Sequence, residues 1–140
     1  MISVFFDSDV VISSFISQTG AAYYLVHTNK IEKYMSNFSS SEVERSLVTK
    51  LSVESEKAKG YLKKHFKQIN LKKSFEEIRT AYSFYVHDQF DAHIVAGARE
   101  AGARCIVTYN MKDYKIELIK RDFEILVITP ANFLQYLRSL

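Results

Sequence analysis

The sequence predicts an α/β fold, a three-layer α/β/α sandwich with a central, mainly parallel sheet. Two observations support this prediction. Short apolar runs alternate along the chain with segments whose apolar residues recur at helical spacing, and parallel strands need such crossover helices between them. With 140 residues, 47% of them apolar and 25% charged, the chain fits one soluble domain that spans residues 1–140.

The elements expected in the N-terminal half follow from these patterns. The apolar run from Ile2 to Phe6 ends at Asp7 and is expected to form the first strand. The elements expected after it are a helix from about residue 9 to 16, a short helix at 21–27, a weaker strand at 31–35, a helix beginning at 39–42 and a charged helix at about 54–66.

One stretch, residues 88–113, organises the C-terminal half. It predicts a helix with Asp91 at its start and a C-terminal end at Ala101–Gly102. A buried strand at Cys105–Val107 and a loop that ends at Asp113 are expected to follow. The elements expected around it are a connector or short strand at 68–71, a helix at 75–85, a last strand at 123–128 and a final helix that begins at Thr129–Pro130.

The composition indicates in which cellular compartment the protein is expected. The single cysteine lies in a predicted buried strand, cannot form an intramolecular disulfide and suits a reducing cytoplasm. The first residues carry no basic leader, and no apolar run approaches the ~20 residues of a membrane span. We therefore expect a cytoplasmic protein without membrane contact.

Charge is distributed unevenly along the chain. The net charge of +3 is too small to indicate a nucleic-acid binder by itself. Seven lysines nevertheless run without an intervening acid, at positions Lys57, Lys59, Lys63, Lys64, Lys67, Lys72 and Lys73. The run fits either a surface that contacts RNA phosphates or a solvated helix face.

Four acids fall where the predicted sheet would carry a ligand site. Asp7 and Asp113 follow strands, whereas Glu42 and Asp91 lie near helix starts, and ligands of parallel sheets bind beyond the carboxyl ends of the strands. Two like charges ~4 Å apart repel by about 4 kcal/mol at an effective dielectric constant of about 20. Hard oxygen ligands of this kind favour Mg²⁺ or Mn²⁺, which can activate water for phosphodiester hydrolysis.

Each acid also has a purely structural interpretation. Asp7 is placed to cap a helix, Asp91 to favour a helix N-terminus and Asp113 to form a turn. Ser39 and Glu42 have the spacing of a capping box. If the acids form a repulsive cluster, replacing Asp7 or Asp113 by Ala leaves the fold intact or stabilised.

Taken together, several segments resemble the successive motifs of PIN domains, and a free-standing domain of this length resembles the VapC-type toxins of bacterial toxin-antitoxin pairs. These segments are Phe5–Ser13, Glu42 six residues after Ser36, Asp91–Ala98, Val107–Tyr114 and Ile128–Leu134. The resemblance implies a PIN-like α/β fold, a metal-dependent endoribonuclease that uses Mg²⁺ or Mn²⁺, an RNA substrate, a cognate antitoxin and a homodimer.

The resemblance also implies roles for individual residues. The acids that match catalytic and metal-binding positions are Asp7, Glu42, Asp91 and Asp113. The three aspartates would hold the ion directly or through water, and Glu42 would orient the attacking water. Thr108 and Asn110 match polar residues that brace the last acid. Asp9 stands where the family more often has Asn or Ser, which adds a carboxylate near the site.

Other residues near the predicted site receive ordinary roles. His93 points roughly 200° away from Asp91 on an ideal helix, so it and His87 are interpreted as polar or partner-contacting residues. Asp88 is expected to start the helix, and Cys105 to be a small core residue.

Three alternatives remain for the function. A PIN fold that only binds another protein would keep the architecture without catalysis. Asp7 to Val11 also resembles the first motif of haloacid-dehalogenase-like phosphatases, and two early acids occur in receiver domains. The phosphatase needs a further strand that ends in paired acids, and the receiver domain needs a lysine after its last strand. Neither feature is evident in the sequence.

Overall fold

The computed structural model describes residues 1–140 and contains a sheet of five strands in the order β3-β2-β1-β4-β5. Every strand pairing is parallel, which confirms the predicted fold class. The strands are β1 (Ile2–Phe6), β2 (Ile31–Ser36), β3 (Lys67–Ile69), β4 (Cys105–Val107) and β5 (Leu126–Ile128).

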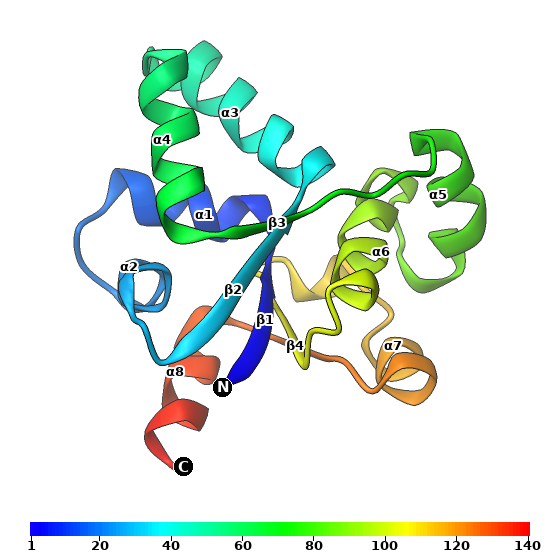
Figure 1. The fold of residues 1–140 in the computed structure, drawn as a ribbon. Helices are drawn as coiled ribbons and strands as arrows, with labels where there is room; N and C mark the ends of the chain where they lie inside the picture. Colours follow the sequence, from blue (N-terminus) through cyan, green and yellow to red (C-terminus); the bar gives the residue numbers. More distant parts are fainter.

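Helices cover both faces of this sheet and complete the three layers (Figure 1). One face is covered by α1 (Ser8–Ile16), α2 (Ala21–His27), α3 (Asn37–Leu51), α4 (Ser55–His65) and α8 (Pro130–Arg138). The other is covered by α5 (Phe75–Tyr82), α6 (Ala92–Glu100) and α7 (Ile116–Phe123). Single 3₁₀ turns lie at Ser83–Tyr85, Gln89–Asp91 and Met111–Asp113.

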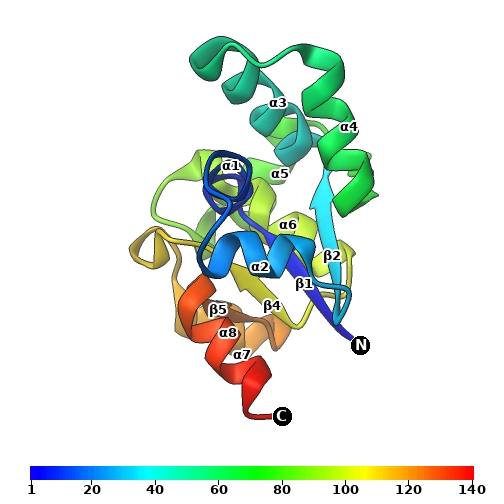
Figure 2. The same cartoon turned by 90° about the vertical axis from the view of Figure 1, so that its left-hand side faces the viewer.

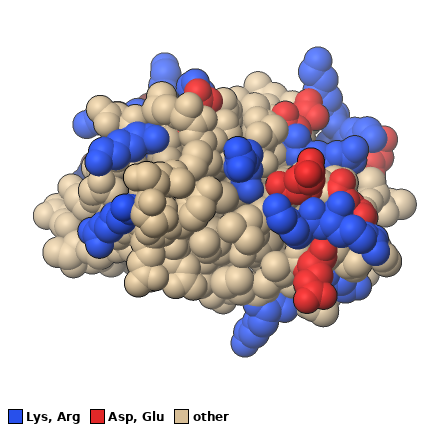
Figure 3. All heavy atoms as spheres, turned by 90° about the horizontal axis from the view of Figure 1, so that it is seen from below, with Lys and Arg blue, Asp and Glu red and all other residues tan.

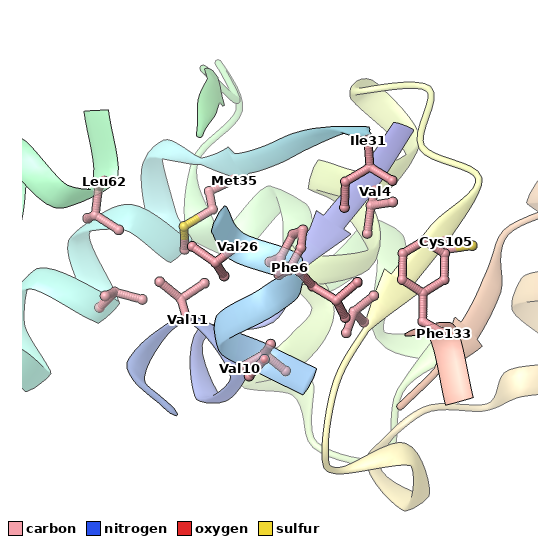
Figure 4. Close-up of a cluster of buried hydrophobic side chains, with 14 of the residues drawn as sticks. Val4, Phe6, Val10, Val11, Val26, Ile31, Met35, Leu62, Cys105 and Phe133 are labelled. Atoms are coloured by element: carbon pink, nitrogen blue, oxygen red, sulfur yellow. The ribbon is translucent and has the colours of Figure 1, made fainter. Parts of the chain in front are cut away.

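The central strand β1 joins two hydrophobic clusters because its side chains alternate between the faces of the sheet. Val4 and Phe6 belong to the cluster beneath α1, α2 and α8, where Val10, Val26 and Phe133 meet them (Figure 4). Phe5 points to the opposite cluster, beneath α6 and α7. Burial on both faces explains why β1 is an almost continuous apolar run.

Close packing of α6 on β1 depends on Gly97. A Cβ atom added at residue 97 would lie 2.6 Å from Cζ and 2.7 Å from Cε2 of Phe5, closer than carbon atoms can approach. The absent side chain therefore lets α6 lie against β1. Gly102 ends the region in the left-handed conformation, with φ of +66°, which confirms the predicted glycine stop.

Two boundaries differ from the sequence prediction. The last strand was expected at 123–128, but α7 occupies residues up to Phe123, and Glu124, with φ of +57°, separates it from β5. The capping box expected between Ser39 and Glu42 is wrong: α3 begins earlier, and Ser36 and Ser39 form its capping box.

A helical hairpin formed by α3 and α4 extends beyond the carboxyl ends of the strands (Figures 1 and 2). The lysines of the run at residues 57–73 have different surroundings near this hairpin. Lys59 and Lys63 line a hollow between α3 and α4, Lys67 pairs with Glu32 at 3.8 Å, and Lys73 lies in a hollow beside α5.

The opposite edge of the sheet, seen from below in Figure 3, has a different character. Lys and Arg side chains alternate with Asp and Glu on the side of α7, and the middle of this face is mainly uncharged. No helix combines the length and apolar character needed to cross a bilayer.

Candidate active site

Asp7 lies at the carboxyl end of β1, in the middle of the sheet, and its carboxylate is buried. Oδ1 accepts a 2.8 Å hydrogen bond from the backbone N–H of Ser8, while Oδ2 accepts one of 2.9 Å from Thr108 and one of 2.7 Å from Tyr114. Asp7 is also the N-cap of α1, so the helix-cap interpretation holds alongside a position in the site. Burial raises the pKa of Asp7, against the opposing effect of these hydrogen bonds.

Asp9 brings a further carboxylate to the same place. Its Oδ2 accepts hydrogen bonds from Asn110 Nδ2 at 2.9 Å and from the backbone N–H of Tyr109 at 3.2 Å. Its Oδ1 is buried and has no hydrogen-bond partner. Burial, followed by the charge of Asp7, raises the pKa of Asp9 to about 7.

The polar residues after β4 therefore hold different acids from those expected. Thr108 donates to Asp7, and Asn110 donates to Asp9, whereas both were expected to brace Asp113. The backbone N–H of Asn110 also donates to Thr108 Oγ1 at 3.0 Å. This loop ties the end of β4 to the start of α1.

Glu42 reaches the site from the second turn of α3, free of the capping role that its spacing from Ser39 suggested. The Ser8 hydroxyl donates a hydrogen bond to Glu42 Oε1. His93 Nε2 lies 3.8 Å from Glu42 Oε2, longer than a hydrogen bond. The His93 ring is the largest influence that lowers the pKa of Glu42, partly opposed by burial, and Ser8 adds to the lowering.

His93 is buried and lies beside Glu42, so its interpretation as an ordinary polar or partner-contacting residue is wrong. It is buried beside the rings of Phe38 and Phe75, at centroid distances of 6.2 and 6.0 Å, and these two rings also contact each other at 5.8 Å. Its Nδ1 atom is buried without a hydrogen-bond partner. From this position on α6, the ring faces α3 and contacts Glu42.

Asp91 occupies the N-cap position of α6, yet its side chain makes no capping hydrogen bond. Asp88 performs that role for the preceding 3₁₀ turn, with Oδ1 accepting from the backbone N–H of Phe90 at 3.0 Å, as predicted. Burial first, then the charges of Asp7, Asp88 and Asp113, raise the pKa of Asp91 to about 7. A structural role does not account for Asp91.

Backbone pairing positions Asp113, the last of the four acids. Val86 and Tyr114 form an antiparallel bridge. On either side of it, the N–H of His87 donates to the carbonyl of Asp113 and the N–H of Lys115 donates to the carbonyl of Tyr85, both at 2.9 Å. The bridge holds the loop after β4 against the chain that leads into Asp91.

The acids influence one another electrostatically across the carboxyl edge of the sheet. Asp7 raises the pKa of both Asp9 and Asp91, Glu42 raises that of Asp7, and Asp113 raises that of Asp91. No Lys or Arg forms an ion pair with any of them. The structure thus brings the four predicted acids into one neighbourhood and adds Asp9 to them.

This neighbourhood suits a divalent cation in its chemistry but is not a ready-made ligand set. No three His, Cys, Asp or Glu side chains are grouped so as to hold one ion. The donors are nevertheless hard oxygens, Asp9 Oδ1 is an unpartnered buried acceptor, and three carboxyl groups, those of Asp7, Asp9 and Asp91, have raised pKa values without a Lys or Arg paired to them. Mg²⁺ fits such a site because it uses few carboxylates and keeps several water ligands.

Sequence reasoning missed two residues that hold the site together. Ser8 hydrogen-bonds to both Asp7 and Glu42. The only sequence feature that pointed to Ser8 was its position between Asp7 and Asp9. The Tyr114 hydroxyl donates a hydrogen bond to Asp7, and the only sequence feature that pointed to Tyr114 was its position next to Asp113. Neither pairing has a local sequence pattern.

Comparison with known proteins identifies the family. A family model described as "PIN domain" matches residues 3–112. The chain belongs to the PIN-domain family. The match includes Asp7, Glu42 and Asp91 and ends one residue before Asp113. No curated protein is similar enough to this PIN domain to count as a match.

The fold of this PIN domain is similar to that of a chain in the crystal structure of VapBC2 from Rickettsia felis bound to a DNA fragment from their promoter. The TM-score is 0.60 with 14% sequence identity, and the similarity covers 91% of this chain and 98% of the other. At this level of identity, the likeness concerns the fold.

Proposed function

We propose that the protein is a metal-dependent endoribonuclease, a single PIN-like nuclease domain spanning residues 1–140. The observation that carries this proposal is the convergence of Asp7, Glu42, Asp91 and Asp113 at the carboxyl edge of the sheet, with no Lys or Arg paired to them. PIN domains of the VapC type are generally nucleases that use divalent metal ions. The proposed cofactor is Mg²⁺ or Mn²⁺.

In this proposal the residues divide the work of hydrolysis. Asp7, Asp91 and Asp113 hold the ion directly or through water, and the ion when bound offsets negative charge on the phosphate. Thr108 and Tyr114 fix the orientation of Asp7. Glu42 is kept ionised near His93, so it can accept a hydrogen bond from the attacking water and orient it towards phosphorus.

RNA cleavage in the presence of Mn²⁺ tests this function. We expect the wild-type protein to cleave RNA with Mn²⁺ and to stop when the metal is chelated. Asp91→Asn should abolish cleavage because it removes a metal-binding carboxylate. Asp88→Asn is the matched control, since Asn retains the cap on Phe90 and activity should persist. Cleavage that continues in chelator would contradict the metal-dependent mechanism.

We further propose that this nuclease is the toxin of a toxin-antitoxin pair that acts in the cytoplasm as a homodimer bound by a cognate antitoxin. The supporting observation is the similarity in fold to a chain in the VapBC2 structure. Expression of the wild-type gene should arrest growth, and co-expression of a small protein encoded beside it should relieve the arrest. Growth unaffected by the wild-type protein would contradict the toxin assignment.

A PIN-fold subunit that binds another protein without catalysis is the second candidate. The lack of a ready-made set of three metal ligands favours it. The cleavage assay separates the two candidates, because such a subunit would not cleave RNA at any Mn²⁺ concentration.

A further inference from the structure

A basic and aromatic surface lies directly beside the acid cluster. It consists of two hollows that share His87: one is also lined by Arg79 and Phe90, the other by Lys112 and Lys115. Their volumes are about 430 and 510 Å³. We call the two hollows together the His87 groove.

Backbone pairing turns the side chains of His87 and Lys115 away from the buried side of the bridge between Val86 and Tyr114. Val86 and Tyr114 face each other across the antiparallel bridge, and both are buried. Side chains alternate along paired extended segments, so the neighbouring His87 and Lys115 project to the opposite side. The Tyr114 hydroxyl on the buried side reaches Asp7. One short bridge thus connects the groove to the acids.

At the other end of the groove, Phe90 presents an aromatic ring next to Asp91. The ring is 62% exposed. It is supported by Phe75, at a centroid distance of 6.0 Å, and by the guanidinium of Arg79, at 5.4 Å. These two residues are four apart on α5, so both approach Phe90 from that helix. The exposed part of the ring is available to a planar group.

Two lysines of the groove are available to a phosphate, whereas Arg79 is paired with Glu76 at 2.8 Å. Lys112 and Lys115 make no ion pair, and Lys115 lies 5.4 Å from the ring centroid of Phe84, which is itself exposed. Asp88 and Glu117 are the acids on the walls. Both lysines lie within two residues of Asp113 in the sequence, so a backbone phosphate beside them would lie next to the acid cluster.

We propose that the His87 groove binds a single-stranded segment of RNA, with an unpaired base stacked on Phe90 and backbone phosphates beside Lys112 and Lys115. This assignment rests on the proposed nuclease function and adds the direction from which the substrate enters the site. Base stacking on an exposed ring requires an unpaired base, whereas a duplex keeps its bases within the stack. The groove therefore selects unpaired RNA.

A fluorescence titration in metal-free buffer tests binding apart from cleavage. The protein contains no Trp, so Phe90→Trp introduces the only indole. We expect an unpaired oligoribonucleotide to quench this fluorescence and a blunt duplex of equal length to leave it unchanged. Binding without any change in fluorescence would place the RNA elsewhere and overturn the proposal, as would the absence of binding.

Two further variants separate stacking from charge. Phe90→Leu keeps an apolar side chain but removes the ring, and it should weaken binding on the order of 5- to 150-fold, as measured for single base–aromatic stacks. Replacing Lys112 and Lys115 by Ala should reduce the slope of log affinity against log salt by about 1.4, or about 0.7 for each lost phosphate contact.

The matched control replaces Lys59 and Lys63, the lysines of the hollow between α3 and α4, and should leave the slope unchanged. If this pair flattens the slope and the groove pair does not, the RNA lies along α4 instead. The result is independent of the proposed chemistry. Quenching by RNA together with no cleavage in Mn²⁺ would retain the groove and reject the nuclease, whereas cleavage without quenching would do the reverse.

Discussion

The hydroxyl of Tyr114 donates a 2.7 Å hydrogen bond to Oδ2 of Asp7, across 107 residues of sequence. Both side chains are buried. The bond joins the loop after β4 to the end of the central strand, so it contributes to the fold and orients an acid of the candidate site.

Tyr114→Phe should therefore lower both stability and metal affinity. It leaves a buried carboxylate with one hydrogen bond fewer, and hydrogen bonds to charged groups are worth about 1.5–3 kcal/mol. We expect a loss of this size in the free energy of unfolding, measured by urea denaturation, and weaker Mn²⁺ binding by calorimetry. Tyr85→Phe is the control, because its hydroxyl bonds to Asp122 on the surface. Equal losses in the two variants would contradict the role of Tyr114.

Replacing Asp91 should stabilise the metal-free protein, whereas replacing Asp7 should destabilise it. Asp91 accepts no capping hydrogen bond, so Asp91→Asn relieves repulsion and should stabilise the metal-free protein at pH 8 by about 1–2 kcal/mol, after allowance for its partial exposure. Asp7→Ala instead leaves the buried Thr108 and Tyr114 hydroxyls without their acceptor and removes a helix cap. It should destabilise by about 2–4 kcal/mol, which corrects the expectation from the sequence that Asp7→Ala leaves the fold intact or stabilised, because these hydrogen bonds outweigh the repulsion. Thermal unfolding of both variants in chelator tests the contrast.

The metal-free protein should lose stability as the pH rises towards 8. The pKa values of Asp9 and Asp91 are raised from 3.8 to about 7 in the folded protein. Their contribution is complete below pH 4 and is lost as the pH rises through 7, because the folded state binds the protons more tightly. Replacing both residues by Asn should reduce this dependence, because only Asp7 then keeps a raised pKa among these acids. We expect the difference in melting temperature between double variant and wild type to increase from pH 5 to pH 8; a constant difference would refute the assignment.

Gly97→Ala should destabilise the protein although Ala is the better helix former. The new methyl group would meet the Phe5 ring at 2.6 Å, and overpacking of this kind costs about 1–3 kcal/mol. Gly60→Ala in α4 is the matched control: no atom lies within 4 Å of the added Cβ, and the change should stabilise by about 0.5–1 kcal/mol. Chemical denaturation of both variants provides the measurement, and a stabilised Gly97→Ala would show that α6 can shift away from β1.

The sequence predicted most of the fold because periodicity is local. The run Cys105–Val107 and the Ala-rich pattern after Asp91 identified β4 and α6 directly. The helix α7 was missed because it has no cap signal: Lys115 occupies its N-cap position and makes no side-chain hydrogen bond there. Its last residue, Phe123, is also close in sequence to the apolar residues of β5, so it was assigned to that strand.

The gathering of the acids at one edge was predictable from the rule for parallel sheets, but their partners were not. Helix geometry predicted that His93 points away from Asp91, but it could not predict that His93 lies beside Glu42 on α3, because that contact depends on tertiary packing. For the same reason Thr108, although recognised, was assigned to Asp113 instead of Asp7.

The position of β1 in the sheet has a consequence for synthesis of the chain. β1 is made before the other four strands of this sheet, yet it pairs on one side with β4, whose residues come about a hundred positions later, and Asp7 has only part of its hydrogen-bonding environment until Tyr114 has been added. A nascent chain therefore carries its first acid long before the last one. The proposed site therefore cannot be complete until Asp113 and Tyr114 have been made and the loop after β4 has packed against β1.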